Sequence, residues 1–291
     1  MAEHRNFSRA AALLHLAQPT VSQQIQALEE EYGTRLLDRT SKSVALTAAG
    51  RALYAQAGAV LRQCAELRRA VLQAAGSVSG PLTLGASQTI GEYILPRLIA
   101  AFQADHPGVT VRLQIHNTEQ IESLVQAGQL DLALVEGPLE SQELLQAAFL
   151  EDHLVVIAPP DHPWRDRSSI SLADLRGERL VMREAGSGTR RVMEAALQAA
   201  GLNPEELHVV TELAGMEAIK GAVEAGMGVA CVSHWAIRKE LRLGTLLARS
   251  IRGVPMQRGL RAVYPAGRTL LPAASALLRL LQSPELLTIL G

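Results

Sequence analysis

Two glutamines near the start of the chain, Gln23 and Gln26, have side chains suited to reading DNA bases. They lie in a stretch whose apolar residues recur every three or four positions, which predicts a helix with the glutamines turned away from a core. A glutamine amide can bond N6 and N7 of adenine together, and the lack of arginine at these positions argues against a guanine-dominated site. The apolar face of this helix would consist of Val21, Ile25, Leu28 and Tyr32.

A shorter helix is predicted before this one. Ser8 can cap a helix that continues through Leu14, and residues 15–17 would form a tight connection. Pro19 suits the first turn of the second helix, where its missing N–H is not needed. A packed helix pair of this kind is typical of a helix-turn-helix, although an ordinary helical hairpin has the same pattern. The groups offered to the major groove would be Gln18, Pro19, Thr20, Ser22, Gln23 and Gln26.

A second candidate for chemistry is the loop at residues 186–190, which reads Gly-Ser-Gly-Thr-Arg. It falls between a predicted strand at 179–182 and a helix that opens at Thr189. Glycines let main-chain N–H groups approach a ligand, and a helix start attracts negative charge. The loop therefore predicts a bound anion, with a plain strand-to-helix turn as the alternative. It is not a nucleotide-binding P-loop, because no Gly-Lys-Ser/Thr follows.

One long helix is predicted for residues 47–75, which contain no proline and are rich in alanine, leucine, arginine and glutamine. Its apolar residues alternate in steps of three and four, the spacing of a coiled-coil seam. A helix of this length gains little unless the stripe is covered, so we expect self-association, with packing on its own domain as the alternative. The seam would consist of Leu53, Ala57, Val60, Cys64, Leu67 and Val71.

Beyond a hinge at residues 76–80, short apolar strands alternate with amphipathic helices, which predicts α/β lobes with mainly parallel sheets. Pro159-Pro160 marks a crossover between two lobes. The predicted strands cover 82–85, 109–115, 130–135, 154–158, 179–182, 209–213, 229–233 and 260–264. The predicted helices start near Pro96, Gln120, Thr189, Met216 and Pro272.

The bulk composition, with 48% hydrophobic and 20% charged residues, fits a folded globular protein. Residues 1–75 carry a net charge of +3 and the remainder −4. This imbalance weakly indicates that the N-terminal part binds a polyanion, but charged residues on solvated helix faces explain it equally well. Only Cys64 and Cys231 are cysteines, no metal-ligand spacing occurs, and the N-terminus has no signal pattern. These features predict a protein of the reducing cytoplasm with no membrane segment.

A specific resemblance lies in residues 6–50, which read NFSRAAALLHLAQPTVSQQIQALEEEYGTRLLDRTSKSVALTAAG. This segment resembles the N-terminal region of LysR-type transcriptional regulators, and the similarity extends over nearly the whole chain. The marks that carry it are Phe7, Ala10, Ala11, Gln18, Pro19, Val21, Ser22, Ile25, Leu28, Glu29, Gly33, Leu36, Leu37, Arg39, Leu46, Thr47 and Gly50.

The resemblance implies an α/β protein with an N-terminal all-α winged helix-turn-helix, a long linker helix and a two-lobed sensor like the periplasmic binding proteins. The expected domains are 1–46 for the DNA-binding head, 47–75 for the linker, 76–80 for the hinge, 81–158 with 263–291 for lobe I, and 159–262 for lobe II. Family members carry a further helix before the segment matching residues 2–4, so we expect the head to lack turns that would cover Val21 and Leu36.

The resemblance also implies the sites and partners. A winged strand pair near 39–46 would present Arg35, Arg39 and Lys42 to the phosphates of promoter DNA. The protein would form a homodimer through 47–75 and a homotetramer through its sensor lobes, with RNA polymerase as a further partner. No cofactor is implied; instead a small anionic effector would bind between the lobes, as in sulfur-assimilation or carbon-fixation regulators. The expected effector-binding residues are Ser87, Gln88, Thr89, Asn117, Glu136, Ser187, Gly188, Thr189, Arg190 and Met216.

Two of these expectations leave alternatives. Glu136 either binds the ligand or caps a helix, and only one of Arg190 and Arg191 can face the cleft. An enzyme with a helical appendage is the competing class, but the sequence has no catalytic triad, metal set or nucleotide fingerprint. A transport solute-binding protein would explain the lobes but not the front end. No catalytic residue is therefore expected.

Overall fold

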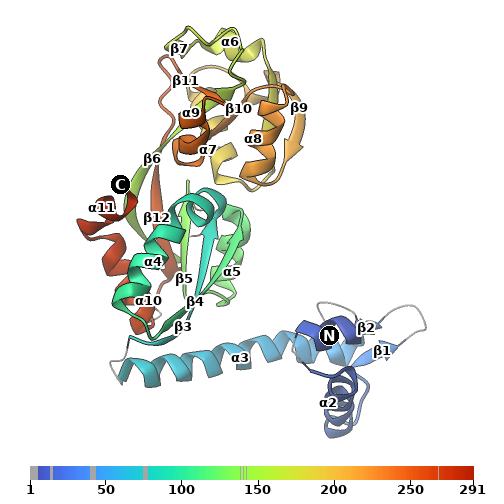
Figure 1. The fold of residues 1–291 in the computed structure, drawn as a ribbon. Coiled ribbons are helices and arrows are strands. Elements are labelled where there is room, and N and C mark those ends of the chain that lie inside the picture. Colours follow the sequence, from blue (N-terminus) through green and yellow to red (C-terminus); the bar gives the residue numbers. More distant parts are fainter. Residues whose placement is uncertain are drawn as a thin grey trace. The chain divides into compact units, whose positions relative to one another are not determined.

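The structure of the protein is a computed structural model, shown in Figure 1. It describes residues 6–13, 16–39, 44–74, 78–137, 139, 141, 143–267 and 269–291. The contacts within the chain divide it into two units, residues 1–70 and 71–291. Each unit is described by itself below. Among the described residues, no helix combines the length and the apolar character needed to cross a bilayer.

The first unit contains the predicted helix pair and a strand pair. Asn6, rather than Ser8, caps the first helix, because its side-chain oxygen accepts a hydrogen bond from the Arg9 main-chain nitrogen at 2.9 Å. The strands pair antiparallel and begin at Leu37, two residues before the predicted wing. The elements are α1 (Phe7–Leu13), α2 (Gln18–Glu31), β1 (Leu37–Arg39) and β2 (Val44–Leu46).

The predicted apolar face of α2 is only partly correct. Val21 is buried and Ile25 half-buried, but Leu28 and Tyr32 are exposed. The reason is that α1 is shorter than α2. Its residues Ala10 and Ala11 are buried, but none of the described elements packs over the last turn of α2. The turns expected to be missing would precede the segment at residues 2–4, which lies outside the described residues. Val21 and Leu36, which those turns were expected to cover, are 6% and 5% exposed.

The long helix is present as α3 (Ala48–Ala74) and begins one residue later than predicted, while its predicted last residue, Ala75, lies outside the described residues. Its seam is largely uncovered: Cys64 is exposed, and the exposed fractions of Val60, Leu67 and Val71 are 57%, 69% and 63%. Leu53 and Ala57, closer to the head, are half-buried. Among the described residues, nothing in the chain packs over the outer part of the stripe, which disfavours packing on its own domain.

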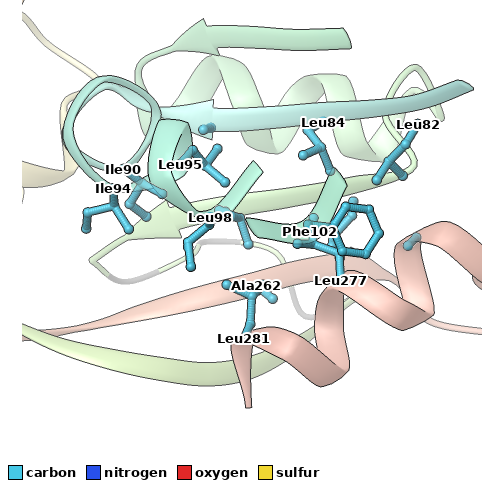
Figure 2. Packing of buried hydrophobic residues seen from close by; sticks show 14 of the residues in the cluster. Leu82, Leu84, Ile90, Ile94, Leu95, Leu98, Phe102, Ala262, Leu277 and Leu281 are labelled. Atoms are coloured by element: carbon cyan, nitrogen blue, oxygen red, sulfur yellow. The ribbon is translucent and has the colours of Figure 1, made fainter. Parts of the chain in front are cut away.

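Lobe I is built on a sheet in which β4, β3 and β5 are parallel, β12 runs antiparallel to β5, and β6 runs antiparallel to β12. Figure 2 shows how its core forms: Leu82 and Leu84 lie against Leu98, Phe102 and helix α10. The strands of this lobe are β3 (Gly80–Ser87), β4 (Val109–His116), β5 (Leu132–Glu136) and β12 (Gln257–Pro265). Its helices are η1 (Ile90–Ile94), α4 (Leu95–Asp105), α5 (Thr118–Gln126), α10 (Pro272–Leu281) and α11 (Glu285–Leu290).

Lobe II packs helices around shorter strands, with a parallel pair β8 and β9 and a group in which β10 and β11 flank the end of β6. The sequence analysis did not predict β7, which has only two residues, or β11, in which polar and apolar residues are mixed. The strands are β7 (Ser169–Ile170), β8 (Arg179–Arg183), β9 (His208–Leu213), β10 (Ala230–Ser233) and β11 (Leu247–Ile251). The helices are α6 (Leu172–Arg176), α7 (Gly188–Ala199), η2 (Pro204–Glu206), α8 (Met216–Glu224), η3 (His234–Ile237) and α9 (Arg238–Leu243).

Two long strands, β6 (Leu144–Ala158) and β12, pass between the lobes (Figure 1). Residues 144–153 of β6 pair with β12, whereas 154–158 pair with β10 and β11 of lobe II. The chain therefore leaves lobe I at about residue 153 and returns at about 257, not near 158 and 263 as predicted. The prediction relied on the continuous apolar run 154–158, because the first half of β6 mixes exposed polar residues with apolar ones.

Candidate DNA-reading face and effector cleft

The start of α2 presents polar side chains to solvent. Pro19 lies in its first turn, and Gln18, Gln23 and Gln26 are exposed, whereas Thr20 and Ser22 are half-buried. The Gln26 amide donates a hydrogen bond to Glu30 one turn later at 2.9 Å. The described residues include no hydrogen-bond partner for the Gln23 side chain, so it can meet a base edge without first breaking a bond.

The end of α2 is tied to the segment that leads into the wing. Glu29 Oε1 accepts hydrogen bonds from the main-chain nitrogens of Leu36 at 2.8 Å and Leu37 at 3.1 Å. Gly33 has a φ of +62°, a left-handed conformation that favours glycine and lets the chain turn directly after the helix. This bonding fixes where the wing begins relative to α2.

The start of α3 is held against the same segment. Thr47 Oγ1 donates to the Arg35 main-chain oxygen at 2.7 Å and accepts from the Gly50 nitrogen at 2.9 Å. A Cβ at Gly50 would overlap the Leu36 main-chain oxygen, so only glycine permits this approach. Arg35 is exposed and lies beside Gln26 in a shared surface hollow. Lys42 and the Arg39 side chain lie outside the described residues.

In the sensor unit, two of the predicted loops lie against each other across the lobes. Thr89 follows β3 of lobe I, Thr189 lies in the first turn of α7 of lobe II, and both are about 1% exposed or less. A Cβ at Gly188 would overlap the Glu136 main-chain oxygen, so this glycine lets α7 approach the end of β5. Ser187 caps α7 by accepting a hydrogen bond from the Arg190 nitrogen.

The sequence did not identify the residue at the centre of this contact, Arg258 of β12. Its guanidinium donates to Thr189 Oγ1 at 2.9 Å and to Thr89 Oγ1 at 3.2 Å, and so connects both lobes. Its Nε donates to Asp152 Oδ2 at 2.8 Å, and Asp152 also accepts from Ser233 at 2.9 Å. The Arg258 side chain is 2% exposed, which makes this a buried, hydrogen-bonded ion pair.

Glu136 lies beside this pair, with its Oε1 3.8 Å from Arg258 Nη1. Burial raises the pKa of its carboxyl above the ordinary 4.5, although Arg258 and Arg183 oppose the shift. Among the described residues, neither Glu136 Oε2 nor Arg183 Nη1 has a hydrogen-bond partner, and both are inaccessible to solvent. Buried polar atoms without partners are uncommon, and a ligand between the lobes would satisfy them. The described residues bring no three His, Cys, Asp or Glu side chains together as a metal site.

Family models match both units. The model for the bacterial regulatory helix-turn-helix protein, lysR family, matches residues 1–51, and the model for the LysR substrate binding domain matches residues 75–284. The chain belongs to the LysR family of transcriptional regulators. It is thus a DNA-binding regulator under small-molecule control, with the winged head and two-lobed sensor that the sequence predicts, and not an enzyme.

Proteins similar to this LysR-type regulator include a regulator of the RuBisCO operon. The RuBisCO operon transcriptional regulator of Allochromatium vinosum is 38% identical over 276 residues, which cover 95% of this chain and 90% of that protein. The solved Synechocystis PCC6803 CcmR regulatory domain in complex with 2-PG is 33% identical with a TM-score of 0.65, and the match covers 70% of this chain and 96% of that one. The crystal structure of CbnR, a LysR family transcriptional regulator, is 22% identical with a TM-score of 0.70 over 97% of this chain and 94% of that chain, and supports the fold alone.

Several predicted effector residues of the LysR-type sensor have other contacts. Arg190 forms ion pairs with Glu194 at 2.8 Å and Glu212 at 2.6 Å within lobe II. Asn117 caps α5 of lobe I and donates to the Ala185 main-chain oxygen of lobe II at 3.3 Å. Met216 is fully buried in the lobe II core.

The Ser87 hydroxyl donates to the Leu134 main-chain oxygen at 3.4 Å, within lobe I. Gln88 is half-buried, and its Oε1 has no hydrogen-bond partner among the described residues. The geometry therefore brings together Thr89, Glu136 and Thr189 around Arg258.

A sequence signal for Arg258 does exist. Arg258, Leu260 and Ala262 alternate along β12 and are all buried, so the arginine continues the apolar face of the strand. A lone cation on the buried side of a strand needs a partner, and that requirement predicts a polar cluster there. Asp152 could not be assigned to it from the sequence, because it lies more than 100 positions away in the chain.

Proposed function

We propose that this regulator binds a small anionic effector between its two lobes, against Arg258, Thr89 and Thr189. The observation that carries the proposal is the position of Arg258, a buried cation bonded to one hydroxyl from each lobe. An anion placed here would meet the guanidinium and both hydroxyls in a site closed to water, where such bonds are strong.

The local charges favour an acidic ligand of low charge. Asp152 already balances Arg258, and burial raises the pKa of the Glu136 carboxyl, which lessens its preference for the charged form. Arg183 adds a second cation whose Nη1 has no partner among the described residues, while its other nitrogens pair with Glu184. A compact anion would give both unpartnered atoms a bond at once.

The relatives support a more specific role. We infer that the regulator controls a carbon-fixation operon, since a RuBisCO operon regulator is 38% identical over almost the full chain. The complex of the CcmR regulatory domain with 2-PG supports an effector of that class for this protein too. RNA polymerase would be the partner through which promoter binding acts, in the cytoplasm, where that DNA is found.

Effector binding would reach the DNA through the assembly. The exposed apolar stripe of α3 supports a homodimer in which two such stripes cover each other, and contacts between sensor lobes would complete a homotetramer. An effector can change DNA binding only if it binds one arrangement of the sensors better than the other.

The effector site is tested by calorimetry with 2-PG on the full chain, together with gel shifts on its upstream DNA. Thr89→Ala and Thr189→Val should remove 2-PG binding and the effector response and leave effector-free DNA binding intact. Thr211→Val, a half-buried threonine on β9, is the control and should behave like the unmodified chain. An unchanged response in both cleft variants, or binding of neutral ligands only, would overturn the anion site and leave the regulator assignment intact.

The dimer is tested by replacing Val60 and Leu67 with aspartate. Burying two charges in the seam would be costly, so sedimentation should show a smaller species. Ala55→Asp, an exposed position on the outer side of α3, is the control that adds charge outside the seam. The seam assignment is wrong if the Val60 and Leu67 variants sediment like the control.

A further inference from the structure

A second cavity lies between the lobes, separate from the cluster around Arg258. Its volume is about 590 Å³, within the roughly 300–1,000 Å³ of small-molecule sites. Lobe I contributes η1, α4 and the chain after α11, and lobe II contributes α8, η3 and α9. None of its lining residues belongs to the effector cleft. We propose that this cavity is a second binding site, for a small, multiply charged oxyanion.

Two arginines converge at its edge. Arg97 of lobe I and Arg238 of lobe II both donate to the Leu290 main-chain oxygen, at 2.7 and 3.4 Å. Arg238 also donates to the Gly291 oxygen at 3.0 Å, and among the described residues neither guanidinium forms an ion pair with an Asp or Glu side chain. Like charges brought this close repel each other, and a shared anion would remove that repulsion. The Arg238 guanidinium also lies 5.0 Å from the ring centre of Trp235.

The inner wall holds one lysine between two carboxylates. Lys220 is 4% exposed and pairs with Glu217 at 2.7 Å and Glu240 at 2.8 Å. Tyr93 of lobe I donates to the same Glu217 oxygen at 2.6 Å, so the wall itself joins the two lobes. Both Glu side chains that line the cavity bond Lys220, and Lys239 also stabilises the charged form of Glu217 and so lowers its pKa. The cavity still has more cations than carboxylates, and among the described residues none of the other cations forms an ion pair with these two glutamates.

Those cations determine the class of ligand. Lys239 and Arg242 are exposed and line the cavity with Arg97 and Arg238, so four positive charges face the space. A neutral ligand would gain nothing from them, and a single charge would satisfy only part of the set. A phosphorylated or polycarboxylate metabolite matches both the charge and the volume.

Such a ligand would act on regulation from outside the effector cleft. By bonding Arg97 and Arg238 together it would connect the lobes at a second place and favour this lobe arrangement. The regulator would then respond to two anions, coupled through the lobe arrangement that each of them favours.

Trp235 provides a direct readout, because the protein contains only two tryptophans and Trp164 is buried in the lobe II core. Inorganic pyrophosphate is titrated into the full chain at constant ionic strength while tryptophan fluorescence is followed. We expect a saturable change that is lost in Trp235→Phe. The double variant Lys239→Gln, Arg242→Gln should weaken binding about tenfold or more, since hydrogen bonds to charged groups are strong. Neither side chain supports the fold through a contact in the described residues.

Two comparisons make the result decisive. Arg112→Gln with Arg279→Gln removes the same charge from exposed positions outside the cavity and should leave pyrophosphate binding unchanged. The Lys239→Gln, Arg242→Gln variant is also compared with the unmodified chain. Equal weakening in the two double variants would reduce the effect to net charge, and unchanged binding in the Lys239→Gln, Arg242→Gln variant would place the anion outside this cavity; either result overturns the second site.

Discussion

The DNA-reading face of α2 and the interlobe cleft are both polar, but they are constructed in opposite ways. On α2, Gln18 and Gln23 are exposed at neighbouring turns of one helix. In the cleft, Arg258 is buried and its partners come from three other parts of the chain. The first surface is ready to bind and depends little on the rest of the fold, whereas the second exists only when both lobes are packed.

This difference has an energetic consequence. Replacing an exposed glutamine of α2 should leave the protein as stable as before and affect only the contact with DNA that we propose for it. Replacing a member of the buried cluster leaves its partner with an uncompensated charge in a dry environment. The two regions should therefore separate cleanly in measurements of stability and of DNA binding.

The largest effect is expected at Arg258. Arg258→Met leaves Asp152 buried without its cation and should lower the free energy of unfolding of the sensor by about 3–5 kcal/mol, measured by urea denaturation. The double variant Arg258→Met, Asp152→Asn should recover part of that loss. Arg261→Met, on the same strand but bonded only to Gln146 near the surface, is the control. Equal stability of the Arg258 and Arg261 variants would contradict the structural role of the pair.

Within the head, Gly50 tests whether the α2 face depends on tertiary packing at all. Gly50→Ala forces a Cβ onto the Leu36 main-chain oxygen, so we expect a loss of about 1–3 kcal/mol, the usual range for overpacking. Gly221→Ala in α8 meets nothing within 4 Å and should gain about 0.5–1 kcal/mol, as expected for alanine inside a helix. Thermal unfolding measures the stability of both variants. If Gly221→Ala also lowers the melting temperature, the loss in Gly50→Ala cannot be attributed to its contact with Leu36.

DNA binding should distinguish reading from positioning. Gln23→Ala should cost about 1–3 kcal/mol on the cognate site and reduce discrimination between sequences, whereas Arg35→Ala should weaken all DNA alike and lower the salt slope by about one. Gel shifts on cognate and random duplexes over a range of salt measure both. If Gln23→Ala weakens both duplexes equally, the glutamine does not read bases.

The smallest effect is a pH dependence at Glu136. Because burial raises its pKa in the folded state, the folded protein holds this proton more tightly, and stability falls as pH rises from about the ordinary 4.5 through the raised value. Glu136→Gln should match the unmodified chain in acid and exceed its stability at pH 8, as seen in melting temperatures across pH. Glu143→Gln, an exposed control, should show no such divergence.

Much of the architecture could be predicted from the sequence because it depends on local periodicity. The three-to-four spacing predicts α2 and α3, and apolar runs predict β3, β4 and β5. Side-chain cover is less predictable: Leu28 and Tyr32 follow the apolar face of α2 yet are exposed, because cover depends on the length of the neighbouring helix. The first half of β6 was not predicted, because its polar residues interrupt the apolar pattern of a strand, although this segment pairs with β12 in the structure.

For the sites, the sequence determined the individual loops. The glycine loop at 186–190 and the polar residues of α2 were recognisable because their conformations and chemistry are set by neighbours in the chain. Only the tertiary structure decided which side chains meet. Arg258, Asp152, Thr89 and Thr189 are brought together by crossover strands that link distant segments, and burial then removes water so that their charges and hydroxyls must satisfy one another. Arg190, next to Thr189 in sequence, turns instead to carboxylates within lobe II, since those partners lie on its side of the helix.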